Sequence, residues 1–287
     1  MTYRIWHATT YLYSEPVTLA HNQAHLEPRA TPSQRLLRHE LSIRPEPRVM
    51  ANRADYFGNP LAFFSIQDPY SKLVIEAESE VELTGFGEDA SNAAGVTWEE
   101  ARDAARQSAD VMEFLFASPL VRPNPYFRRY AEPSFTPGRP LVEAVADLNR
   151  RIHSDFRYVP ESTQVDTPVE KAFAERKGVC QDFAHVMIAS LRSLGIPARY
   201  VSGYIPSTAQ SVGADASHAW AAVFCPGIGW AGFDPTNNAA TSNSHVTLGW
   251  GRDYSDIPPI KGVMLGGGEH IVRVAVSVEP EGGLATL

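Results

Sequence analysis

The spacing of the apolar residues changes at about residue 85, and this change limits the fold more than any other feature of the sequence. Before it, apolar and polar residues alternate at period two, as in residues 3–11 and 75–82, which is typical of strands with one buried face. Beyond it, apolar residues recur every three or four positions, as in residues 141–152 and 183–194, which is typical of amphipathic helices. The sequence therefore predicts an all-β domain followed by an α+β domain.

Composition divides the chain into three segments. Residues 1–85 are predicted to be the N-terminal β domain. Residues 86–140 start polar and glycine-rich and end rich in proline, so we expect a helical and proline-rich connection. Within it, Thr97–Glu100 has the pattern of a capping box, and the helix is expected to run to Pro119. Residues 141–287 are predicted to form the second domain, which closes with C-terminal strands.

Charge and cysteine content exclude several classes of protein. Lys and Arg number 25 and Asp and Glu number 33, which gives a net charge of -8, and no basic run offsets it. Nucleic acid and anionic membranes are therefore poor partners. Two cysteines are too few for a disulfide framework in a chain of this length. With neither a basic leader nor a long apolar run, we expect a soluble, cytoplasmic protein.

The segment from Gly178 to His185 carries the clearest chemical signal. Cys180 directly precedes the buried stripe of a predicted helix and follows a glycine that lets the backbone turn. The unpaired N–H groups and the dipole at a helix N-terminus favour negative charge, and so favour the nucleophilic thiolate. A small buried hydrophobe is the alternative use of a free cysteine. A base elsewhere in the sequence has to decide between them.

A candidate base and a candidate carboxylate follow Cys180. His218 lies on a predicted strand and Asp234 ends the next one, with a turn sequence between them. A loop of residues 225–227 would put His218 directly opposite Asp234, whereas a two-residue Pro-Gly loop would move the aspartate to the other face. Taken singly, these are a packed strand histidine and a turn aspartate. Together the three residues supply the nucleophile, base and orienting carboxylate of thiol acyl transfer.

Three sequence blocks stand in order along the second domain: Gly-Val-Cys-Gln-Asp-Phe-Ala-His at 178–185, Asp-Ala-Ser-His-Ala-Trp at 215–220 and Gly-Trp-Ala-Gly-Phe-Asp-Pro-Thr-Asn at 229–237. They resemble the bacterial transglutaminase-like family, and further matches at 7–11, 26–29, 55–59 and 251–259 extend the resemblance over nearly the whole chain. It implies a papain/transglutaminase-like fold with an N-terminal all-β domain. It also implies that Cys180 is the nucleophile, His218 the base and Asp234 the residue that orients the imidazole.

One position departs from the related papain-type pattern. Papain-type peptidases place an oxyanion-stabilising glutamine six residues before the cysteine, and Ala174 stands there instead. Gln164 and Gln181 do not match by position. We therefore expect the backbone N–H of Cys180 to be one oxyanion donor, and the sequence does not predict the second.

The remaining candidates receive structural interpretations. Cys225 is expected to be structural, on the strand face opposite His218 or in the turn. His185 does not share the helix face of Cys180, and we expect a satisfied core histidine. Asp182 suits the helix dipole, with binding of a substrate amine as the alternative. The sequence predicts no cofactor, and no Cys/His pair has the spacing of a zinc site.

The sequence thus predicts a thiol-dependent enzyme that acts on peptide or isopeptide bonds, with hydrolysis favoured. Water as the acceptor makes a peptidase or amidase, and an amine makes a protein-glutamine transglutaminase. A non-catalytic peptide-binding or scaffold module is the third alternative, and the intact set of three residues argues against it. The expected partner is a peptide or protein substrate, and the sequence does not predict the oligomeric state.

Overall fold

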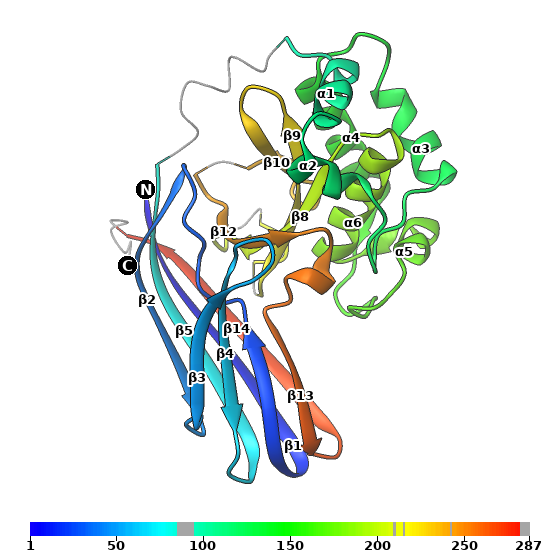
Figure 1. The fold of residues 1–287 in the computed structure, drawn as a ribbon. Coiled ribbons are helices and arrows are strands. Elements are labelled where there is room, and N and C mark those ends of the chain that lie inside the picture. The colour runs from blue at the N-terminus through cyan, green and yellow to red at the C-terminus, as the bar shows by residue number, and fades with distance from the viewer. Residues whose placement is uncertain (85–94, 209–210, 215, 242, 282–287) are drawn as a thin grey trace.

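The structure is a computed structural model that describes residues 1–84, 95–208, 211–214, 216–241 and 243–281. The N-terminal domain contains seven strands: β1 (Thr2–Ala24), β2 (Gln34–Arg44), β3 (Val49–Ala54), β4 (Pro60–Ile66), β5 (Tyr70–Leu83), β13 (Ile260–Gly266) and β14 (His270–Pro280). The end of the chain therefore returns to the domain in which it begins (Figure 1). These last strands were predicted as part of residues 141–287, and in the structure they pair with β1. The segment boundaries at 85 and 140 stay predictions.

The long strand β1 takes part in two layers of the β domain. Its first part, residues 2–12, lies between β5 and β14, whereas residues 17–24 lie between β4 and β13. In Figure 1 the strand turns back between these parts, at the lower end of the domain. Strand β2 extends the first layer beside β5, and β3 extends the second beside β4. Phe64 of β4 and Ile75 of β5 belong to one buried cluster, so the two layers share a core.

The second domain combines helices with an antiparallel sheet, as predicted. Its elements are α1 (Trp98–Ala105), α2 (Ala109–Met112), η2 (Glu113–Leu115), α3 (Pro125–Ala131), η3 (Glu132–Ser134), α4 (Leu141–Asp155), β6 (Arg157–Tyr158), α5 (Val169–Glu175), β7 (Lys177–Gly178), α6 (Cys180–Ser193), β8 (Ala198–Tyr204), β9 (His218–Cys225), β10 (Gly229–Asp234), β11 (Ala239–Ala240), β12 (Val246–Gly251) and η4 (Tyr254–Asp256). The sheet has the order β11-β10-β9-β8-β12, and β6 and β7 form a separate parallel pair. The apolar face of α6 packs on β8 and β9 in the main core.

The helix predicted to run from residue 97 to Pro119 is shorter than expected. Its capping box forms: Glu100 N donates to the Thr97 hydroxyl, and Thr97 N donates to the Glu100 carboxylate. The helix α1 then ends at Ala105, and α2 and η2 follow as separate short elements. Ser108 has an extended backbone (φ -124°, ψ 118°), which interrupts the helical hydrogen bonds. The start of the helix was therefore predicted correctly, and its length was overestimated.

The two domains meet at β12. Val246 and Leu248 are buried in a cluster with Ile5 of β1. The side chain of Gln34 pairs with the backbone of Thr247, because Gln34 Nε2 donates to Thr247 O at 2.7 Å and Thr247 N donates to Gln34 Oε1 at 2.7 Å. Strand β12 is thus bonded to β8 within its own sheet and fixed by the N-terminal domain as well.

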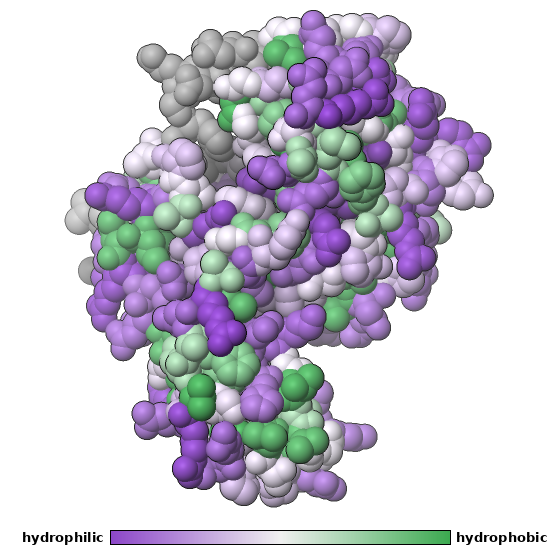
Figure 2. Space-filling view, viewed as in Figure 1, coloured by the Kyte–Doolittle hydropathy of each residue, from purple (hydrophilic) through white to green (hydrophobic). Residues whose placement is uncertain are grey.

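The surface of the molecule is largely hydrophilic in the view of Figure 2, with apolar patches on the lower, N-terminal β domain. Large exposed apolar side chains occur on the last two strands, where Val263, Leu265 and Ile271 are 70%, 61% and 59% exposed. Among the described residues, no helix combines the length and apolar character that a membrane span requires.

Candidate active site

Cys180 is the first residue of α6, as the sequence predicts. Val179 before it is extended (φ -112°, ψ -178°), and its N–H donates to Asp182 Oδ2 at 2.8 Å. The same oxygen accepts a 2.6 Å bond from the hydroxyl of Thr163. A Cβ atom on Gly178 would lie 2.5 Å from that oxygen, so only glycine fits there. Asp182 therefore builds the turn into the helix, and this use of Oδ2 leaves little support for binding of a substrate amine.

The two cysteines have different surroundings. Cys180 is partly exposed, and Cys225 is buried in the main core at the end of β9. Burial raises the pKa of Cys225 to about 12. Both thiols are free. Only Cys180 is therefore accessible to a substrate in this structure.

His218 and Asp234 are bonded to each other in the interior. His218 Nε2 lies 2.8 Å from Asp234 Oδ2, and neither side chain is exposed. The strands pair Cys225 with Gly229 and Ala221 with Phe233, and this register differs by two residues from a direct His218–Asp234 pairing. Neither loop considered from the sequence is correct. A shift of two residues keeps both side chains on one face of the sheet, so the contact still forms diagonally.

The other ring nitrogen of His218, Nδ1, lies on the side of the ring away from the bond to Asp234. This Nδ1 atom is buried and has no hydrogen-bond partner of normal geometry within the described ranges. Burial by itself would lower the pKa of His218, but the bond to Asp234 and the neighbouring Cys180 thiol outweigh it and raise the pKa to about 10. The structure thus brings all three sequence-predicted residues together.

The Asp234 carboxylate has more partners than the sequence suggested. Oδ1 accepts from Thr236 N at 2.9 Å and from Asn237 N at 3.2 Å, and Oδ2 accepts from Asn237 Nδ2 at 2.8 Å. His245 Nε2 is also 3.4 Å from Oδ2. Burial would raise the pKa of Asp234, but the bonds to both histidines outweigh it and hold the pKa well below its usual range. The carboxylate is therefore ionised and held from several sides.

Asn237 and His245 also contact Asp234, and the sequence did not predict either contact. Asn237 stands three residues after Asp234, where a turn following an aspartate could have indicated it. His245 carries no motif and lies on the far side of the sheet order, beside β12. Its ring stands edge-on to Trp220, with the ring centroids 5.2 Å apart.

A glycine lies against the imidazole of His218. A Cβ atom on Gly213 would be 3.1 Å from His218 Nδ1 and 3.2 Å from the hydroxyl of Tyr158. Gly213 has φ +80°, a conformation that favours glycine. The preceding residue is fixed by Asn237, because Val212 N donates to Asn237 Oδ1 at 2.8 Å. Asn237 thus joins this segment to the Asp234 carboxylate.

In the structure the backbone N–H of Cys180 is still the candidate oxyanion donor. The Cys180 N–H is the first of α6 and has no acceptor within the helix. Gln181 Nε2 donates to Val165 O at 2.9 Å, so that amide is already bonded within the protein.

His185 is buried, its Nε2 accepts from Tyr254 N at 3.2 Å, and burial lowers its pKa to about 4. It is therefore a neutral core histidine, as predicted. Among the described residues, no three His, Cys, Asp or Glu side chains are grouped so that they could hold a metal ion.

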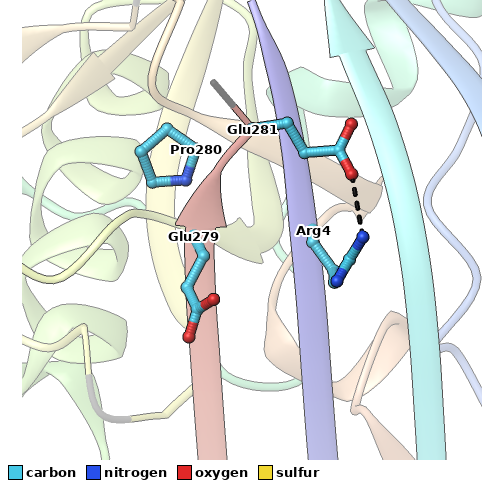
Figure 3. A pocket seen from close by; sticks show the side chains of 4 residues that line it. All are labelled: Arg4, Glu279, Pro280 and Glu281. Atoms are coloured by element: carbon cyan, nitrogen blue, oxygen red, sulfur yellow. Dashed lines mark hydrogen bonds and ion pairs between the residues drawn. The ribbon is translucent and has the colours of Figure 1, made fainter. Parts of the chain in front are cut away.

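A surface pocket occurs elsewhere, at the ends of β1 and β14. It is lined by Arg4, Glu279, Pro280 and Glu281 (Figure 3). Arg4 Nη2 and Glu281 Oε1 are 3.1 Å apart, and the arginine side chain is 70% exposed. Exposed pairs of this kind contribute little energy, and these strands supply none of the three predicted residues.

Comparison with known proteins supports the fold and the family. Residues 3–82 match the model of the bacterial transglutaminase-like N-terminal region, and residues 128–235 match the transglutaminase-like superfamily. An uncharacterised protein of Mycobacterium tuberculosis is 38% identical over 290 residues, which cover 97% of this chain and 92% of that protein. A protein-glutamine gamma-glutamyltransferase of Pseudomonas aeruginosa is 35% identical over 111 residues, 36% of this chain and 16% of that protein.

A solved structure shows the same fold over the whole chain. A candidate cysteine protease of Cytophaga hutchinsonii superposes with a TM-score of 0.81 and 22% sequence identity, covering 100% of this chain and 92% of its own. The predicted transglutaminase-like fold with an N-terminal all-β domain is therefore confirmed.

Proposed function

Because the chain belongs to the transglutaminase-like superfamily, we propose that it is a thiol-dependent acyl-transfer enzyme whose triad is Cys180, His218 and Asp234. One observation carries the proposal: a buried imidazole is bonded to an ionised carboxylate and has a partly exposed thiol at a helix start as its neighbour. This arrangement supplies the nucleophile, the base and the orienting group that acyl transfer needs.

The proposed reaction begins with a thiolate–imidazolium pair. The Cys180 sulfur attacks the carbonyl carbon of an amide, and the carbonyl electron pair moves onto oxygen near the Cys180 N–H. His218 gives its proton to the leaving nitrogen as the C–N bond breaks, which leaves a thioester. Water then gives a proton to His218 and attacks the thioester, and the C–S bond breaks to release the acid and the thiolate. Asp234 stabilises the imidazolium throughout.

Hydrolysis of a peptide or isopeptide bond is the outcome that we propose. A second candidate is transfer of the acyl group to an amine, and the Pseudomonas aeruginosa protein-glutamine gamma-glutamyltransferase supports it through its match over 111 residues. A non-catalytic scaffold is disfavoured, because it would have no need to retain a thiol, an imidazole and a carboxylate in contact. The two free cysteines support activity in a reducing compartment, and we propose the cytoplasm.

The test compares the intact chain with Cys180→Ala on a pool of cell-derived peptides, with and without an added primary amine. Mass spectrometry of the products separates the candidates. Hydrolysis adds water to the substrate, whereas transamidation replaces ammonia or a peptide fragment by the amine. We expect hydrolysis products from the intact chain and none from Cys180→Ala. Cys225→Ser is the matched control and should retain activity. Identical products from the intact chain and Cys180→Ala would contradict the proposal.

A further inference from the structure

His245 occupies a place at the triad that the proposed mechanism does not use. Its Nε2 atom is 3.4 Å from Asp234 Oδ2, the same oxygen that bonds His218. Its side chain is only 6% exposed, and its ring packs edge-on against Trp220. Two imidazoles therefore share one oxygen of a carboxylate that is itself fully buried.

The position of His245 depends on β12, because it directly precedes that strand. Thr247, two residues on, exchanges two 2.7 Å bonds with the side chain of Gln34, and its carbonyl also accepts from Arg29 N at 3.1 Å. Val246 is fully buried in the cluster that contains Ile5. Gln34, Arg29 and Ile5, which contact β12 here, all come from the N-terminal β domain. That domain therefore fixes the strand that presents His245.

We propose that His245 is a positioning residue that shares the Asp234 carboxylate with His218, and that the N-terminal β domain holds it there through the Gln34–Thr247 pairing. The proposal rests on the proposed function, since it assigns His245 a role through the triad. It also gives the N-terminal domain a catalytic purpose. A hydrogen bond to a charged group is stronger than one between neutral groups, so the second donor draws carboxylate charge away from His218.

Loss of the His245 contact should raise the pKa of His218. Four titratable groups face or influence its ring: Asp234 from β10, Cys180 from α6, Tyr158 from β6, and His245 through Asp234. Removal of the His245 donor leaves the carboxylate charge less dispersed, and the imidazolium form of His218 becomes more stable. His218 should then hold its proton to a higher pH and give it less readily to a leaving amine.

The experiment measures the titration of His218 directly by NMR in the full chain with ¹⁵N-labelled histidine. A Cys180→Ala background removes the influence of the thiol, so the readout does not depend on the nucleophile. In this background His245→Phe keeps a ring but removes the donor, and we expect the His218 midpoint to rise by about one pH unit. His245→Gln keeps an N–H donor of similar reach and should restore the parent midpoint. His39→Phe is the matched control, since it removes a remote histidine bonded to Ser79.

A second arm tests the contribution of the N-terminal domain. Gln34→Leu removes the pairing with Thr247 without touching the triad, and the His218 midpoint should move in the same direction as with His245→Phe. Arg38→Ala on the same strand is the matched control, because the Arg38 side chain pairs with Glu40 at the exposed surface. Both controls should leave the midpoint unchanged.

The outcomes separate this inference from the proposed function. If His245→Phe and His245→Gln both leave the His218 midpoint of the parent unchanged, the role of His245 is wrong, whatever the enzyme does. If only Gln34→Leu has no effect, the role of the N-terminal domain is wrong. The proposed function fails on different evidence, namely when Cys180→Ala forms the same products as the intact chain.

Discussion

The two thiols of this chain should differ in alkylation rate by several orders of magnitude at neutral pH. With a pKa of about 12, only about 1 in 100,000 molecules carries Cys225 as thiolate at pH 7. An ordinary thiol with a pKa of about 8.5 is ionised to about 3% at that pH. Ionisation alone therefore gives a partly exposed thiol an advantage of about 3,000-fold over Cys225, before the burial of Cys225 is considered.

His218 should add a characteristic pH dependence to this difference. The pKa of His218 is raised to about 10, so the ring is an imidazolium between pH 6 and pH 8, and a cation beside a thiol favours its thiolate form. An unassisted thiol loses about a hundredfold in rate between pH 8 and pH 6, because its thiolate fraction falls tenfold per unit. We expect Cys180 to lose less than about tenfold over that interval, and His218→Gln to restore the steep dependence.

The assay is alkylation by limiting iodoacetamide, followed by peptide mapping with mass spectrometry at several pH values. Cys180→Ser and Cys225→Ser identify the signal of each thiol and serve as matched controls. Equal rates for the two cysteines would refute the argument from burial. A hundredfold loss at Cys180 between pH 8 and pH 6 would refute the thiolate–imidazolium pair.

Three further predictions concern the triad and its support. Asp234→Asn should fold normally but lower kcat by roughly 10²–10⁴-fold, because an amide cannot stabilise the imidazolium by charge; steady-state kinetics on a confirmed substrate would check it, and full activity would contradict it. Gly178→Ala should lower the free energy of unfolding by about 1–3 kcal/mol through the clash with Asp182, as measured by denaturant titration. Stabilisation by the His218–Asp234 pair should be greatest between about pH 4 and pH 6.5 and should decline toward pH 10. The raised pKa of His218 favours the fold below about 6.5, and the lowered pKa of Asp234 favours it above about 3.9. Thermal melts of the intact chain against His218→Gln would test this.

The local features of the site could be predicted because neighbouring residues determine them. The start of α6 at Cys180 follows from the glycine before it and the apolar stripe after it. The register between β9 and β10 could not be predicted, because the length of the loop decides it. That loop closes with Gly227 and Gly229 at φ +88° and +85°, and a sequence with several glycines and a proline fits more than one turn. His218 and Asp234 still lie on one face of the sheet because the observed register differs from the expected one by an even number of residues.

The contacts that escaped prediction join segments that are distant in the sheet order. Strands β9 and β8 stand between β10, which carries Asp234, and β12, which follows His245. Periodicity reports which face a residue occupies and says nothing about which strands become neighbours. The return of β13 and β14 to β1 escaped prediction for the same reason, since their pairing partners lie about 250 residues earlier in the chain.

This return gives the second domain an unusual constraint. The domain is inserted between β5 and β13, so both of its ends lead into strands that pair with β1. Strand β12 leads through η4 into β13, and Thr247 of β12 is hydrogen-bonded to the side chain of Gln34. A displacement of β12 would therefore have to break its bonds to Gln34 as well as its own bonds to β8. The edge strand β12 is thus held both by β8 and by the β domain, although that domain supplies none of the three residues of the proposed triad.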